Sequence, residues 1–151
     1  MTAPRLIVAL AIALGVAAGA RVAAADNASA ECSYLEISAT NAKAPAMDAE
    51  LQPLQKKLKK PPFGSWNAFK KLSGGPVQLA KLKGKSLALA QGAASLLLRD
   101  RTDGTLQLTV SIDDADGKRV LDNKQSVAAN DWIVWGHNVK DDGHILALTC
   151  K

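Results

Sequence analysis

Apolar and polar residues alternate in a series of short segments along most of the chain. The clearest alternation spans residues 105–112, where Leu106, Leu108, Val110 and Ile112 share one face and polar side chains share the other. This period of two predicts a half-buried β-strand. Further strands are predicted at residues 32–39, 77–82, 86–90, 94–99, 119–128, 131–135 and 145–150.

Asp-Gly dipeptides mark the predicted turns between these strands. They occur at residues 103–104, 116–117 and 142–143, and Asp-Gly favours a tight hairpin connection. Short strands at regular spacing with such turns indicate a sandwich or a small barrel. We therefore predict a mainly β fold, a β-sandwich-like domain of about 7–8 short strands.

One segment has helical rather than strand periodicity. Leu51, Leu54 and Leu58 recur at the spacing of one helix face, so they predict a short helix with a buried leucine stripe. Asp48 is a candidate N-cap for this helix. The double proline at residues 61–62 ends it, because proline cannot continue a helix.

The first 25 residues have the layout of a secretory signal peptide. Arg5 supplies a positive start, residues 6–20 form an uncharged apolar run, and alanines 23–25 form a small-residue cleavage site. The alternative is a membrane anchor, but a spanning helix needs about 20 apolar residues and Arg21 interrupts the run. We predict that residues 26–151 form a single domain exported to the periplasm or the cell exterior.

Two cysteines, Cys32 and Cys150, lie near the two ends of the mature chain. In an oxidising compartment an even number of cysteines is read as a disulfide framework. A thiol nucleophile would need one cysteine left free, and a lipidated Cys32 would need a small residue where Glu31 stands. We therefore predict a Cys32–Cys150 disulfide that places the first and last strands side by side.

Charge is unevenly distributed along a chain whose formal net charge is +5. Residues 51–99 contain ten Lys or Arg and no Asp or Glu, whereas Asp outnumbers Lys plus Arg from Asp100 onward. A clustered basic face attracts anions, so candidate partners are an anionic envelope polymer, a lipid or an acidic protein. The alternative is a solvated face that keeps the protein soluble. The predicted anion-binding residues are Lys56, Lys57, Lys59, Lys60, Lys70 and Lys71.

Three aromatic residues, Phe63, Trp66 and Phe69, follow the double proline at intervals of three. Interleaved with lysines, they could form a patch that stacks on sugars or bases. The alternative, which we favour, is a plug over the open edge of the sandwich, because aromatic side chains of this size are mostly buried.

Residues that could support catalysis or hold a metal are few. His137 and His144 are the only histidines, and their spacing is not a compact zinc-ligand spacing. Residues 113–117 resemble a calcium loop but lack the later bidentate glutamate, and a tight turn explains their Asp and Gly content. We predict no enzymatic activity, no cofactor and no metal site.

The segment PPFGSWNAFKKL at residues 61–72, preceded by its lysines and followed by weak strands and a glycine-led final strand, resembles a group of uncharacterised small exported bacterial proteins. Their shared motif is K-K-P-P-F-x-[ST]-[YW]-x-x-F after a short lysine-rich helix. The resemblance implies an exported β-rich domain and no activity or ligand. We predict a non-enzymatic binding or accessory module of the cell envelope. The alternatives are a structural or assembly subunit that pairs through a sheet edge, and a hydrolase acting through His137 or His144.

Overall fold

Nine strands and three short helical turns make up residues 28–151, the part of the chain that the computed structural model describes. The predicted signal peptide, residues 1–25, lies outside the described residues. The elements are β1 (Ser29–Thr40), β2 (Ala46–Met47), the 3-10 helix η1 (Ala49–Leu54), α1 (Gln55–Leu58), the 3-10 helix η2 (Phe63–Ser65), β3 (Ala68–Ala80), β4 (Gly84–Leu89), β5 (Gly92–Thr102), β6 (Thr105–Asp113), β7 (Arg119–Ala128), β8 (Trp132–Val139) and β9 (Asp142–Cys150).

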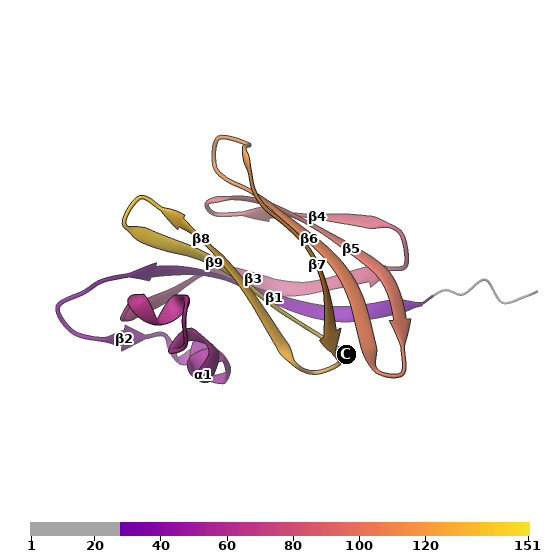
Figure 1. Ribbon diagram of the computed structural model, residues 1–151, viewed down its shortest axis with the longest axis horizontal. Helices are drawn as coiled ribbons and strands as arrows, with labels where there is room; N and C mark the ends of the chain where they lie inside the picture. Colours follow the sequence, from indigo (N-terminus) through magenta and orange to yellow (C-terminus); the bar gives the residue numbers. More distant parts are fainter. Residues whose placement is uncertain (1–27) are drawn as a thin grey trace, which may run out of the picture.

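The strands form two sheets that pack face to face as a sandwich. One sheet has the order β2-β3-β1-β9-β8 and the other the order β4-β5-β6-β7; Figure 1 shows both, with the helical turns on the far side of the first sheet. The short β2 pairs with β3 in parallel, and the other neighbours within each sheet are antiparallel. The predicted mainly β, sandwich-like fold with one short helix is confirmed, with nine strands where about 7–8 were expected.

Two hydrophobic clusters lie on opposite faces of the first sheet. Between the sheets, the apolar face predicted for β6, including Leu108 and Ile112, packs with Leu146 and Leu148 of β9. On the other face, the leucine stripe of η1 and α1 packs with Ile37, Ala39, Phe69, Ile145 and Ala147. The first sheet is therefore covered on both faces, which accounts for the unbroken apolar run at residues 145–148.

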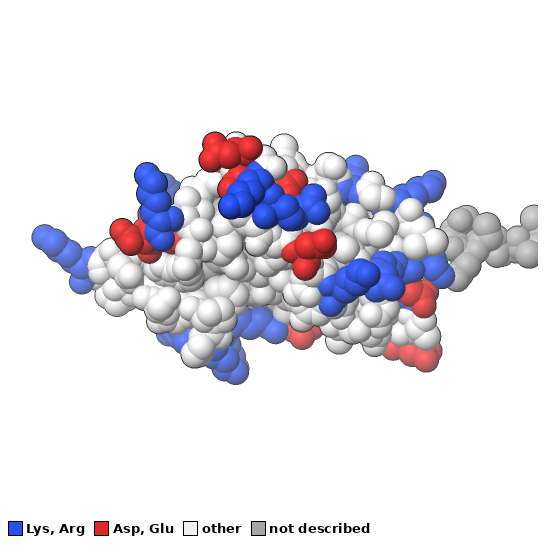
Figure 2. Space-filling view, turned by 45° about the horizontal axis from the view of Figure 1, so that its top comes forward, with Lys and Arg blue, Asp and Glu red and all other residues white. Residues whose placement is uncertain are grey.

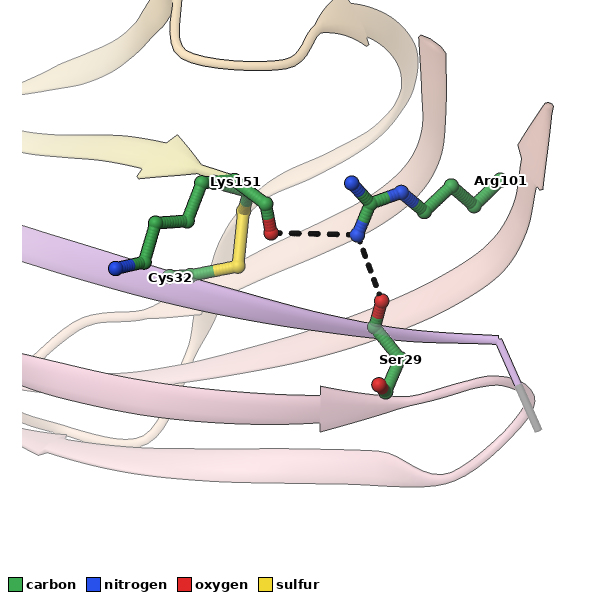
Figure 3. Close-up of a disulfide and its surroundings, with 5 residues drawn as sticks. Ser29, Cys32, Arg101 and Lys151 are labelled. Atoms are coloured by element: carbon green, nitrogen blue, oxygen red, sulfur yellow. Dashed lines mark hydrogen bonds between the residues drawn. A yellow bond between two sulfur atoms is a disulfide. The ribbon is translucent and has the colours of Figure 1, made fainter. Parts of the chain in front are cut away.

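The disulfide predicted between Cys32 and Cys150 is confirmed. The two residues are directly opposite one another in the β1–β9 register, with a Cα–Cα distance of 4.0 Å. Beside it, Arg101 of β5 donates from Nη1 to the carbonyl oxygens of Ser29 at 2.9 Å and Lys151 at 3.2 Å (Figure 3). A covalent bond and a cation therefore join β1 and the residues at the end of β9 to each other and to the second sheet.

The last hairpin differs from the prediction. Asp142 and Gly143 were expected to form the turn, but both lie in β9, and the turn is formed by Lys140 and Asp141, with Lys140 at a φ of 59°. Gly143 is required for another reason, because the indole of Trp66 lies 2.7–2.9 Å from where its Cβ would be. The glycine marks a close approach of two segments and not a turn.

Two smaller expectations also change. A strand was predicted to begin at residue 77, but β3 begins at Ala68 and pairs with β1 along its whole length. Asp48 precedes η1 without capping it through its side chain; instead its carboxylate accepts the backbone N–H of Lys71 at 2.9 Å. Among residues 28–151, no helix is long and apolar enough to cross a bilayer.

Candidate functional site

Two of the six predicted anion-binding lysines are engaged by carboxylates. Lys57 Nζ lies 3.4 Å from an Asp131 oxygen, and Lys71 Nζ lies 2.8 Å from a Glu50 oxygen. Figure 2 shows that basic and acidic residues are also interspersed on the visible face, where Lys and Arg lie beside Asp and Glu. These two lysines therefore contribute less to a positive surface than the sequence indicated.

The other four lysines divide between two faces. Lys70 neighbours Lys71 on β3, and because strand residues alternate, it lies on the face away from the helical turns. Lys56, Lys59 and Lys60 are exposed at α1 and the residues after it, and they make no ion pair within residues 28–151. We call these three the α1 lysines. They are the part of the predicted set that remains as one unpaired cationic group.

A groove of about 320 Å³ lies between β2 and α1, and Lys59 is the α1 lysine that lines it. We call it the Trp66 groove, and its walls include Met47, Gln55, Lys59, Trp66, Asn67 and Phe69. It therefore combines apolar and aromatic surface with one cation and two amides. Such a mixture of apolar walls and a few polar groups is typical of ligand sites.

The aromatic wall of the groove is fixed in place by the β8–β9 hairpin. Trp66 Nε1 donates to the carbonyl oxygen of Asp141 at 3.2 Å, and the indole rests on Gly143. Phe63 packs in the same way on Gly136, and Phe69 is buried in the cluster beneath the helical turns. All three predicted aromatic residues thus pack against the first sheet, while Trp66 and Phe69 also line the groove.

A second group of polar residues lies between the sheets, and of its members the sequence singled out the histidines but not Glu36. Glu36 of β1 and His144 of β9 are fully buried, with Glu36 Oε1 2.8 Å from His144 Nε2. The carboxylate also accepts hydrogen bonds from the Ser73 hydroxyl at 2.5 Å and from the backbone N–H groups of Ala90 at 2.8 Å and Gln91 at 3.0 Å. Glu36 therefore links the centre of the first sheet to the β4–β5 turn of the second.

The hydrogen bonds to Glu36 determine its charge. Burial raises the pKa of this carboxyl, but the bonds from Ser73, from the two N–H groups and from His144 outweigh it, so the pKa lies below its ordinary value. Glu36 is therefore an ionised carboxylate in the interior at neutral pH. Four donors occupy the roughly four acceptor positions that a carboxylate offers.

The two histidines form a neighbouring pair. His137 lies directly opposite His144 in the β8–β9 register, and their ring centroids are 5.0 Å apart in an edge-to-face arrangement. Both nitrogens of His137 and Nδ1 of His144 are buried without a hydrogen-bond partner among the described residues. Burial and the nearby His144 lower the pKa of His137, while Asp114 partly opposes them. His137 is therefore neutral at pH 7.

A cleft of about 270 Å³ lies beside this pair, at the open end of the sandwich. Its walls come from Gln91 after β4, from Asp114 and Asp116 after β6, and from His137 near the end of β8. We call it the mouth cleft; the hairpins that surround it lie at the upper left of Figure 1. Within the described residues, no three His, Cys, Asp or Glu side chains are grouped so that they could hold a metal ion.

Comparisons of this chain with models of protein families, with curated proteins and with solved structures found no match in any of the three.

Proposed function

We propose that this protein is a non-enzymatic, exported binding module whose ligand is an anionic polymer of the cell envelope. The observation that carries the proposal is that the α1 lysines adjoin the Trp66 groove through Lys59, which is one of its walls. Among the described residues these three cations have no acidic partner, and Trp66 and Phe69 give the groove an aromatic wall.

The chemistry of this surface suits an extended polyanion. Lysines that neutralise a polyanion release its counterions, which gives affinity without demanding one fixed geometry. The Trp66 groove adds apolar and aromatic surface against which one unit of the polymer can pack. Lys59 and the Gln55 amide lie near its charged groups, whereas the Asn67 amide is already bonded to the backbone of Ala42. Since the hairpin already holds the indole, little side-chain entropy is lost on binding.

The test is charge reversal of the α1 lysines, Lys56→Glu, Lys59→Glu and Lys60→Glu together. Retention on immobilised heparin at pH 7.5 is measured over a salt series. We expect earlier elution, and a slope of log affinity against log salt that is smaller by about 2, from three lost contacts at roughly 0.7 each.

The matched control reverses three exposed lysines elsewhere, Lys83→Glu, Lys85→Glu and Lys124→Glu, and therefore has the same net charge as the test variant. We expect its elution to remain close to that of the unmodified protein. Equal shifts for the two variants would show that net charge alone governs retention, and the proposed site would be wrong.

A further inference from the structure

The β8–β9 hairpin lies between the histidine pair and the aromatic residues that pack on the first sheet. Toward the second sheet it presents His137 and His144, which lie opposite one another. Toward the helical turns it presents Gly136 and Gly143, on which Phe63 and Trp66 rest. A displacement of this hairpin would therefore change the shape of both the mouth cleft and the Trp66 groove.

The surroundings of His137 accept its ring only while it is neutral, because both of its nitrogens are buried without a partner among the described residues. From β1, Glu36 faces His144 with its acceptor positions already filled by four donors. The β4–β5 turn directs only backbone N–H groups toward this carboxylate, and Ser73 of β3 is a further donor. A proton added to His137 would therefore find no free acceptor on Glu36, and a buried charged donor without a partner is costly.

The remaining charged groups near the pair lie at the cleft mouth. Asp114 and Asp116 belong to the β6–β7 turn and line the mouth cleft with His137. Asp114 Oδ1 already accepts the N–H groups of Asp116 and Lys118. A protonated His137 gains these carboxylates or water by turning outward, away from its buried position beside His144.

We propose that His137 forms a proton-sensitive latch. In the neutral state its ring packs edge to face on His144 and holds the β8–β9 hairpin against the second sheet. In mild acid the protonated ring turns out into the mouth cleft and displaces the hairpin. Because Trp66 depends on Asp141 and Gly143 of that hairpin, the Trp66 groove loses its aromatic wall. The consequence for ligand release rests on the proposed function, whereas the movement itself does not.

The test uses the ligand-free protein. The indole N–H of Trp66, assigned with a Trp66→Phe variant, is followed by NMR hydrogen exchange at pH 7.5 and 5.5, with correction for intrinsic exchange. We expect protection of this N–H to fall roughly tenfold in acid, because the displaced hairpin no longer holds the Asp141 carbonyl against the indole. The amide of Lys151, bonded to Glu31 at the other end of the sandwich, should keep its protection.

A His137→Gln variant cannot titrate at the latch, so its Trp66 protection should not change between the two pH values. Equal losses in this variant and in the unmodified protein would overturn the latch, as would constant protection in the unmodified protein. Parallel loss at Lys151 would mean global unfolding and would also overturn it.

A measurement on the unmodified protein keeps the test valid if the variant does not fold. The titration of His137, followed through its ring carbon shifts, should have the same midpoint as the loss of Trp66 protection, and different midpoints would overturn the latch. Heparin retention at pH 7.5 tests only the proposed anion binding, and hydrogen exchange of the ligand-free protein tests only the latch. Failure of one proposal is therefore distinguishable from failure of the other.

Discussion

Glu36 shows how a single residue can remain charged in a protein interior. A carboxylate that leaves water must recover its hydrogen bonds from the protein, and Glu36 recovers them from Ser73, Ala90, Gln91 and His144. Two of these donors belong to the turn that leads into β5. The same residue therefore satisfies a buried charge and fixes the spacing of the two sheets at the mouth cleft.

We predict that Glu36→Gln destabilises the protein by about 3–5 kcal/mol, because removing one partner of a buried charged network leaves the others unsatisfied. The amide would also place donors opposite the N–H groups of Ala90 and Gln91. Urea unfolding at pH 7.5 measures the loss. The control is Glu31→Gln. The Glu31 carboxylate pairs with an exposed lysine at 3.4 Å, so its loss should lower the free energy of unfolding by only about 0–1 kcal/mol. Equal losses would show that burial of Glu36 has no energetic consequence.

The pH profile of stability distinguishes Glu36 from His137. The folded pKa of Glu36 lies below its ordinary value of 4.5, so its contribution is complete above that pH and is lost as the pH falls toward the folded pKa. The folded pKa of His137 lies below 6.5, so its loss begins at higher pH, as the unfolded chain takes up protons first. Glu36→Gln should therefore remove the acid-side loss and His137→Gln the loss that begins near 6.5.

At the scale of elements, the β8–β9 hairpin shows what local patterns reveal and what they omit. The alternation in β6 and the Asp-Gly turns before and after it were predicted correctly, since these features depend on neighbours in the chain. Gly143 could not be interpreted in this way, because the ring that requires a glycine there comes from Trp66, far away in sequence. The misplaced turn also hid the pairing of His137 with His144.

We predict that Gly143→Ala destabilises the protein by about 1–3 kcal/mol. The new Cβ would lie 2.7–2.9 Å from three indole carbons of Trp66, so the ring must leave its place against the hairpin. Urea unfolding measures the destabilisation, and the Trp66 indole resonance should shift. The control is Gly84→Ala, where a Cβ would meet no atom within 4 Å. An unchanged indole resonance in Gly143→Ala would show that Trp66 does not depend on this glycine.

At the scale of the whole molecule, the first sheet has no solvent-facing side at its centre. In β1, Glu36 belongs to the more polar of two alternating sets of residues, and Ile37 to the apolar one, a pattern typical of one exposed and one buried face. In the fold, Ile37 packs beneath the helical turns and Glu36 lies between the sheets. Short-range pattern distinguishes two faces but does not tell what covers each. The sequence therefore predicted the strands and the disulfide, while the buried polar network emerged only from their arrangement.

The disulfide acts on the whole chain, because it closes a loop with a sequence separation of 118. We predict that Cys32→Ala combined with Cys150→Ala lowers the free energy of unfolding by about 3–5 kcal/mol, mainly by releasing the unfolded chain. The fold should persist, since β1 and β9 remain paired and Arg101 still joins both ends to β5. Urea unfolding of the variant should show a larger m-value, because its unfolded state exposes more surface. Reductant should destabilise only the unmodified protein. A loss below about 1 kcal/mol would mean that the unfolded chain is equally compact without the bridge.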